Sequence, residues 1–301
     1  MLSIIQASRP LNLFIVALTQ YFFYYLFFIN GDSTGSLSLY PNLLYPFIAV
    51  TLIITVCGFY INDYFDYNSD IDNQKSNKLK HRSSYLSLYF FFLITGFVLA
   101  YWIAYSIGLP FLSLIYIIAN LLLFLYSSHW KKQVLIGNVI VALFSAFVIL
   151  IIVYAEWEII SSIEWQQNTA SGEAISIIVF YSAFIFLISM IREMLKDIED
   201  IEGDKAAGYR TLPIVNSPEK AQVLSGLNSI VLIFLLASWY YSLMHIHDTL
   251  LSFYFGIAIL VPTALLTIFI FKAQDKKQFH HLSQLCKAIM LSGLIYLILL
   301  M

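Results

Sequence analysis

Nine long apolar stretches alternate with short polar segments along the chain. With soft boundaries, they cover residues 11–30, 43–61, 84–105, 108–127, 134–154, 174–192, 221–243, 249–271 and 283–301. A helix needs about 20 mostly apolar residues to cross a bilayer. In hydrocarbon every backbone polar group needs an internal partner, so such runs are expected to be helical. The pattern predicts an all-α integral membrane protein of nine transmembrane helices, forming a single polytopic domain over residues 1–301.

The composition and the distribution of charge support this topology. Charged residues make up only 11% of the chain, against about 25% in soluble domains. All 16 Lys and Arg residues fall in the N-terminal segment, in the even-numbered loops or at the adjoining helix ends. The opposite loops, near 31–42, 155–173 and 244–248, contain none. Because positive residues stay in the cytoplasm, we expect the N-terminus inside and the C-terminus outside.

Two acidic segments with identical spacing lie at the predicted cytoplasmic ends of the second and sixth helices. The pattern Asp-x₂-Asp-x₃-Asp places one triad at Asp63, Asp66 and Asp70, and the other at Asp197, Asp200 and Asp204. At about 100° per residue, these offsets bring three carboxylates within about a 60° arc of a helix. The pattern therefore predicts two rows of carboxylates at the membrane surface.

Neighbouring acids complete this prediction. Glu193 joins the face of the second triad, whereas Asp72, Glu199 and Glu202 are expected to point the other way into solvent. Gly203 could end its helix, in which case Asp204 would approach from a loop. The competing interpretation is that each motif is simply a solvated acidic helix end. This is disfavoured because two triads of matched spacing occur in a protein that is otherwise poor in acids.

Clustered carboxylates need cations because like charges destabilise one another. Mg²⁺ prefers oxygen ligands and commonly binds one or two carboxylates together with waters and substrate phosphates. Two clusters could hold Mg²⁺ ions around a diphosphate and stabilise the charge on the departing pyrophosphate. We therefore expect Mg²⁺ as cofactor, with the six aspartates as ligands and Asp63, Asp66, Asp197 and Asp200 as catalytic residues.

Further polar residues lie where a diphosphate or a buried substrate would need them. The candidates for binding diphosphate are Asn62, Lys78, Lys131, Lys205 and Arg210. Ordinary positive-inside bias is the alternative for each basic residue. Asn12, Tyr126 and Asn138 are candidates for lining a cavity, although an intramembrane Asn often serves only to bond neighbouring helices.

These motifs resemble the UbiA family of intramembrane prenyltransferases over nearly the whole chain. Asn62-Asp63-x₂-Asp66-x₃-Asp70 and Asp197-x₂-Asp200-x₃-Asp204 are similar to its two aspartate-rich motifs. Two flanking segments are also similar: Arg9-Pro10-x-Asn12, and Tyr126-Ser127-x₂-Trp130-Lys131 followed by Gly137-Asn138. The resemblance implies a helical bundle around a central cavity that opens laterally to lipid, with the two motifs facing each other at the cytoplasmic rim.

The resemblance also implies a reaction. A prenyl diphosphate would ionise to an allylic cation, which a carbon or hydroxyl nucleophile of a lipophilic acceptor would capture. The segment from Arg192 to Pro213 looks most like the branch that transfers geranylgeranyl from its diphosphate to geranylgeranylglyceryl phosphate. The chain departs from the family pattern at residues 73–78. Many members have Pro and Arg in this segment, whereas this chain has no Pro there and has Lys in place of Arg.

The sequence thus predicts a Mg²⁺-dependent, multi-pass prenyltransferase of a bacterial or archaeal cell membrane, with its active site on the cytoplasmic side. Prenyl diphosphate, a lipophilic acceptor and the bilayer are the expected partners, and no nucleic acid is expected. An aromatic or quinone-precursor prenyltransferase remains an alternative within the family. A non-catalytic protein that binds diphosphate lipids and a transporter are the alternatives from other classes, although a transporter would more often carry isolated charges near the midplane.

Overall fold

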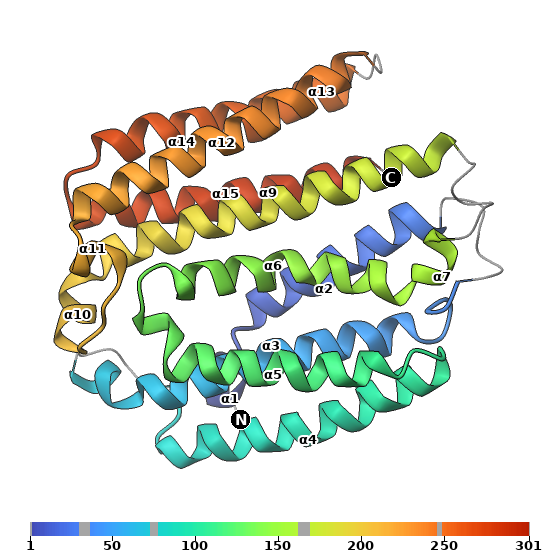
Figure 1. Cartoon of the computed structure of the whole chain (residues 1–301), viewed down its shortest axis with the longest axis horizontal. Coiled ribbons are helices and arrows are strands. Elements are labelled where there is room, and N and C mark those ends of the chain that lie inside the picture. Colours follow the sequence, from blue (N-terminus) through green and yellow to red (C-terminus); the bar gives the residue numbers. More distant parts are fainter. Residues whose placement is uncertain (1, 30–36, 73–77, 162–168, 246–248, 301) are drawn as a thin grey trace. The chain divides into compact units, whose positions relative to one another are not determined.

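The computed structural model describes residues 2–29, 37–72, 78–161, 169–245 and 249–300, without the side chains of residues 2, 68–72, 169–174 and 245. Every regular element in these ranges is a helix (Figure 1). Nine of the helices are long and apolar enough to cross a membrane, counted over the same ranges. The prediction of an all-α protein with nine membrane spans is confirmed.

Contacts between Cα atoms group the chain into two compact units. Unit 1 comprises residues 1–130 and 151–167, and unit 2 comprises residues 131–150 and 168–301. The predicted single domain over 1–301 stays a prediction.

Unit 1 is organised around α3, which packs against α2, α4 and α5, while α4 and α5 also pack against each other. Its helices are α1 (Leu2–Ala7), α2 (Pro10–Tyr24) with its π-helical continuation η1 (Tyr25–Ile29), α3 (Leu44–Asp72), α4 (Arg82–Ser106), α5 (Phe111–Ser128) and α7 (Trp157–Ile160). The turn from α4 to α5 is tight, as predicted, because Gly108 adopts a positive φ of 70° and Pro110 caps α5.

Unit 2 is organised around α9, which packs against α12 and α15, with α14 contacting both α12 and α15. Its helices are the 3₁₀ turn η2 (Trp130–Lys132), α9 (Thr169–Glu199), α10 (Ile201–Ala206), α11 (Leu212–Val215), α12 (Pro218–His245), α13 (Thr249–Phe255), the π-helical η3 (Gly256–Leu260), α14 (Val261–Lys272) and α15 (Lys276–Leu299). The helix α6 (Ile136–Ala155) begins in unit 2 and ends in unit 1.

Three helices extend beyond the ends predicted from hydropathy. α3 continues to Asp72, α9 to Glu199, and α15 begins at Lys276 rather than at 283. Hydropathy marks where apolar side chains stop, whereas the backbone hydrogen bonds of a helix continue past that point. As a consequence, Lys287 does not lie at a helix end as expected. It lies about 16 Å along α15, at 1.5 Å per residue.

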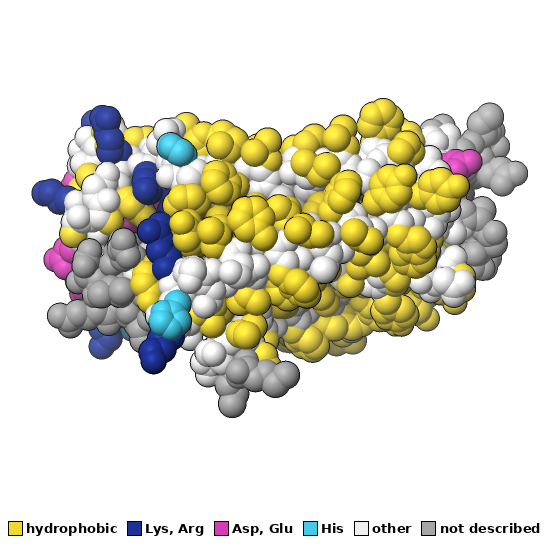
Figure 2. Space-filling model, turned by 90° about the horizontal axis from the view of Figure 1, so that it is seen from below, with side chains coloured by type: hydrophobic (Ala, Val, Ile, Leu, Met, Phe, Trp, Pro, Cys, Tyr) yellow, Lys and Arg dark blue, Asp and Glu magenta, His cyan; other side chains and the backbone are white. Residues whose placement is uncertain are grey.

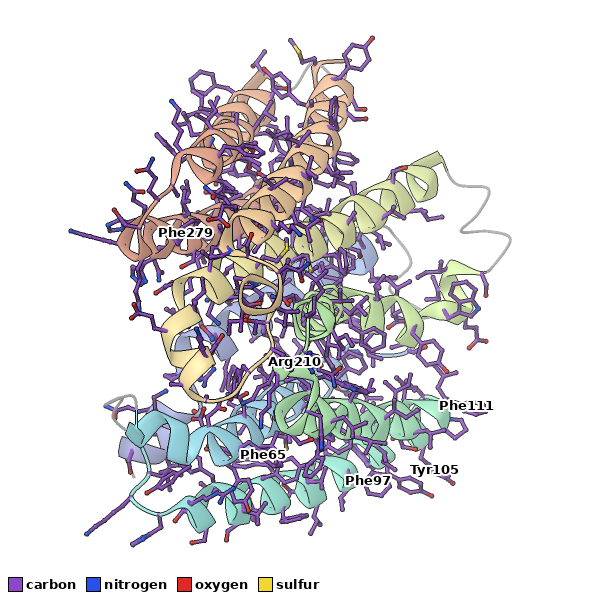
Figure 3. The ribbon with its side chains drawn as sticks, turned by 60° about the vertical axis from the view of Figure 1, so that its left-hand side comes forward. Phe65, Phe97, Tyr105, Phe111, Arg210 and Phe279 are labelled. Carbon is purple, nitrogen blue, oxygen red and sulfur yellow. The ribbon has the colours of Figure 1, made fainter. Side chains whose placement is uncertain are left out.

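The surface fits a membrane protein. The face seen in Figure 2 is covered by hydrophobic side chains over most of its length, and its Lys and Arg side chains gather at one end. At the turn between α4 and α5, Tyr105 and Phe111 are 79% and 66% exposed (Figure 3). Exposed aromatic rings at helix ends are typical of membrane–water interfaces.

Candidate active site

The first acidic motif lies on the last turns of α3 in unit 1. Asp63 is 9% exposed, and its Oδ1 accepts a hydrogen bond of 2.7 Å from the guanidinium of Arg9. The charge of Lys78 also acts on Asp63. On the same helix, Asn62 Nδ2 donates to Asp66 Oδ2 at 2.8 Å. The first two carboxylates of the motif therefore each have a defined partner, and the side chain of Asp70 lies outside the described residues.

Arg9 reaches Asp63 from an unusual backbone conformation. It precedes α2 with φ 52° and ψ 64°, a left-handed region that costs roughly 1–2 kcal/mol for a residue with a Cβ. Its guanidinium also lies over the ring of Phe59, 4.6 Å from the centroid. Strained residues cluster at functional sites. The sequence analysis assigned no role to Arg9. Its position, directly before the Pro that begins the first span, could have marked it as a cation near the membrane surface.

Aromatic residues of α3 hold the basic segment that follows the motif. Arg82 lies 4.2 Å from the ring centroid of Tyr64, and its Nε donates to the Tyr64 carbonyl at 3.1 Å. Tyr67 donates its hydroxyl to the carbonyl of Lys80 at 2.7 Å. Phe65, labelled in Figure 3, packs edge-on against Phe124 of α5. Lys78 and its neighbours are thereby anchored beside the acidic end of α3.

The second acidic motif spans a break between two helices of unit 2. α9 ends at Glu199, Asp200 occupies the N-cap position of α10, and the amide of Asp204 donates to the Asp200 carbonyl at 2.9 Å. The break therefore falls at Asp200 rather than at Gly203, which lies within α10. Asp204 approaches from a helix, and the expectation that it would come from a loop is wrong.

Asp197 is held from α6. Asn138 is 5% exposed, and its Nδ2 donates to Asp197 Oδ2 at 2.8 Å. An amide that donates to a carboxylate fixes the orientation of that carboxylate without neutralising it. Asn138 thus serves the motif directly, in addition to its predicted place beside a cavity.

The segment after α10 folds back onto the basic turn η2. Lys131 and Lys132 lie 5.8 Å and 5.5 Å from the ring centroid of Tyr209. The amide of Arg210 donates to the Lys132 carbonyl at 2.8 Å, and Gly208 allows the preceding turn with φ 73°. The structure thereby brings the segment that contains Arg210, labelled in Figure 3, onto the turn that contains Lys131, from a distant part of the sequence.

The remaining candidates are more loosely placed. Lys205 and Arg210 have exposed side chains, and Tyr126 is half-buried. Asn12 is exposed on α2, and its backbone amide donates to the Arg9 carbonyl. Nothing in the described residues assigns a role to Asn12, Tyr126 or Lys205, and their functions stay predictions.

One expectation about the acids is wrong. Glu199 does not point freely into solvent: its side chain is 17% exposed and pairs with His280 Nδ1 of α15 at 2.8 Å. Sequence reasoning assigned no role to His280, because the pairing depends on how α9 packs against α15.

The donor set is compatible with a magnesium ion. Among the described residues, no three His, Cys, Asp or Glu side chains form a ready-made metal cluster. Mg²⁺ does not require one, because it commonly takes one or two carboxylates and completes its shell with water and substrate phosphates. The carboxylates of Asp63 and Asp66, and those of Asp197 and Asp200, supply oxygen ligands of that kind at two helix ends.

Comparison with known proteins identifies relatives. Residues 14–284 match the UbiA prenyltransferase family. A digeranylgeranylglyceryl phosphate synthase of Thermococcus sibiricus is 30% identical over 232 residues, which cover 76% of this chain and 74% of the relative. The enzyme of the same name from Methanosphaera stadtmanae is 28% identical over 246 residues, covering 79% of this chain and 80% of the relative.

Two solved structures share the fold. A structure described as that of a digeranylgeranylglyceryl phosphate synthase in membranes aligns with a TM-score of 0.67 at 22% identity, covering 99% of this chain and 96% of the other. A UbiA homologue of Aeropyrum pernix K1 aligns with a TM-score of 0.58 at 16% identity, covering 93% of this chain and 96% of the other. From the family match and the length of similarity to its members, the chain belongs to the UbiA prenyltransferase family.

Proposed function

We propose that this membrane prenyltransferase transfers a geranylgeranyl group from geranylgeranyl diphosphate to the hydroxyl of geranylgeranylglyceryl phosphate. The acceptor and donor are those that the names of its relatives indicate, and those relatives match over about three quarters of their own length. The observation that carries the proposal is the pair of held carboxylates: Asp63 is fixed by Arg9, and Asp197 by Asn138. Oriented carboxylates at helix ends are what a metal-bound diphosphate requires.

Mg²⁺ would supply the Lewis-acid chemistry that stabilises the departing diphosphate. In this proposal Asp63 and Asp66 would hold one Mg²⁺ ion in unit 1, and Asp197 and Asp200 would hold another in unit 2. Lys78, Lys131 and Arg210 provide cationic donors for the diphosphate oxygens, with the Arg fork suited to two oxygens and each Lys acting as a point charge. Each motif contributes to binding of the diphosphate–metal complex, and the active site faces the cytoplasm of an archaeal or bacterial cell.

The test is a turnover assay on purified protein in nanodiscs. Radiolabelled geranylgeranyl diphosphate and Mg²⁺ are supplied, and geranylgeranylglyceryl phosphate, hydroxybenzoate and dihydroxynaphthoate are offered separately as acceptors. We expect Mg²⁺-dependent transfer to the glycerophosphate ether alone. Transfer to an aromatic acceptor instead would assign the chain to a different branch of the same family and refute the proposed acceptor.

A further inference from the structure

A group of charged residues lies between α9 and α15, within two of the candidate membrane spans. Two contacts fix how these helices pair: Glu199 with His280 at one end, and the Tyr181 hydroxyl with the Gly293 carbonyl further along at 2.9 Å. The helices are therefore antiparallel. Counting seven residues from the Glu199–His280 pair along each helix brings Arg192 and Lys287 to the same level, about 10 Å further along both helices.

One carboxylate serves the cations of this group. Glu193, whose side chain is 14% exposed, accepts from Arg192 through Oε1 and from Lys196 through Oε2, the latter at 3.2 Å. Lys287 lies close enough for its charge to act on Glu193, Arg192 and Lys196. Three cations thus lie near Glu193, and Glu199 is a second carboxylate whose charge acts on Lys287.

The group has unused capacity to bind an anion. Lys287 makes no ion pair with any residue that the structure describes. Over the same residues, Nε of Arg192 is buried without a hydrogen-bond partner. Ionisable residues within a membrane span are expensive and are normally paired. A buried polar group without a partner costs roughly 1–3 kcal/mol. The ammonium group of Lys287 and Nε of Arg192 are therefore donors that an anionic ligand would satisfy.

A phosphate group matches the available donors. Guanidinium groups bind phosphate oxygens through two parallel hydrogen bonds, and an ammonium group adds a point charge. The group also lies beside the second acidic motif, since the charges of Glu193 and Lys196 act at Asp197. A ligand held here through its phosphate would lie at the same end of α9 as Asp197, which we assign to the metal ion that binds the diphosphate.

We propose that Arg192, Lys196 and Lys287 bind the phosphate group of the prenyl acceptor, and so select a phosphorylated lipid over its free alcohol. This inference rests on the proposed function, because it takes the acceptor to be geranylgeranylglyceryl phosphate. Headgroups of the surrounding phospholipids and the donor diphosphate share the same chemistry, and the experiment separates these three sources.

The experiment measures binding without turnover, so it can fail or succeed independently of the reaction. Acceptor is titrated into the full-length protein in phosphatidylcholine nanodiscs without the donor, and tryptophan fluorescence reports the Kd. The ligands are geranylgeranylglyceryl phosphate, its dephosphorylated alcohol and, in a separate titration, geranylgeranyl diphosphate with Mg²⁺. Lys287→Gln is the principal variant, because an exposed and unpaired side chain can be exchanged without disturbing packing. Lys277→Gln, exposed at the start of α15, is the matched control.

We expect Lys287→Gln to weaken binding of the phosphorylated acceptor about tenfold or more, as for a lost charge-assisted hydrogen bond. Binding of the alcohol and of the donor should be unchanged, and the control should resemble the wild type. Equal losses for phosphate and alcohol, or no loss, would overturn the proposal. A loss confined to the donor would overturn the assignment to the acceptor. In nanodiscs containing phosphatidylglycerol, competition that requires Lys287 would likewise overturn it in favour of bulk lipid.

Discussion

The two acidic motifs share one spacing but hold their first carboxylates in different ways. In unit 1, Asp63 lies on an unbroken helix and pairs with a cation, Arg9. In unit 2, Asp197 lies just before a break in its helix and accepts from a neutral amide, Asn138. A guanidinium brings a positive charge to the carboxylate that it orients, whereas an amide brings only a hydrogen bond.

The difference indicates separate tasks for the two motifs. Among the described residues Asp197 makes no ion pair, and Glu193, four residues before it on α9, is paired with two cations. Under the proposed metal assignment, a metal ion at Asp63 competes with Arg9 for the carboxylate oxygens. The same assignment predicts that the two motifs differ in how their Mg²⁺ requirement responds to loss of the residue that holds the first carboxylate.

The largest expected effect comes from removing either first carboxylate. Asp63→Asn and Asp197→Asn should each lower kcat/KM about 100-fold or more, because even the loss of a residue that only orients a metal ligand costs about 10–100-fold. Steady-state assays with geranylgeranyl diphosphate measure this loss, and circular dichroism and gel filtration check folding. Glu202→Gln, exposed on α10, is the control and should keep its activity. Full activity in both Asp variants would refute the carboxylate assignment.

The residues that hold these carboxylates should change the Mg²⁺ requirement in opposite directions. Arg9→Gln removes the cation that competes with Mg²⁺ at Asp63, so the Mg²⁺ concentration for half-maximal rate should fall several-fold. Asn138→Ala releases Asp197 from its orientation, so that concentration should rise about 10–100-fold. Titrations with Mn²⁺, followed by electron paramagnetic resonance, should rank the metal affinities of the variants in the same order without turnover. A rise in both variants would show that Arg9 serves only to orient Asp63.

The sequence predicted the repeating elements of this molecule better than the contacts between them. Nine spans and two acidic helix ends follow from hydropathy and spacing, because each is a local property of the chain. Arg9 lies 54 residues from Asp63, and Asn138 lies 59 residues from Asp197. Such pairs form only once helices pack, and no local pattern encodes them.

The errors share a physical cause. Hydropathy places the start of α15 where apolar residues begin, which assigns Lys287 to a helix terminus, and the helical angle that turns Glu199 away from the Asp triad assigns it to solvent. Both helices continue further and pack against each other, so that Glu199 pairs with His280 and Lys287 falls within a span. Long charged side chains can pack their apolar stems against a neighbouring helix, so a helix can continue through a polar stretch of sequence.

The third prediction concerns a buried carboxylate, Glu156, at the end of unit 1 opposite the acidic motif. Glu156 is fully buried and accepts from the Tyr24 hydroxyl at 2.7 Å and from the amides of Ser38 and Leu39 at 2.9 Å each. In Glu156→Gln, the new amide NH₂ group would face one of these hydrogen-bond donors in place of an accepting oxygen. The loss of that hydrogen bond should cost roughly 1–3 kcal/mol of stability. We expect a lower melting temperature in detergent with kcat retained in the folded fraction.

Glu158→Gln is the control for this change, because Glu158 is exposed two residues further along. It should melt as the wild type does. An unchanged melting temperature for Glu156→Gln would show that the carboxylate charge is not needed there. A fall in kcat without a change in melting temperature would instead connect this buried carboxylate to catalysis. Catalysis would then not be confined to the acidic end of unit 1.

The smallest effect is expected where α9 meets α15 at the aqueous end. His280 is 49% exposed on its side chain, so its pair with Glu199 is screened by solvent and should contribute at most about 1 kcal/mol. His280→Gln should therefore change the melting temperature and the acceptor Kd little, although it lies on the same face of α15 as Lys287, two turns away. Lys287→Gln, two turns deeper, should leave stability equally unaffected but weaken the phosphorylated acceptor. If His280→Gln weakened the acceptor as much, binding would depend on the pairing of the two helices rather than on the charge of Lys287.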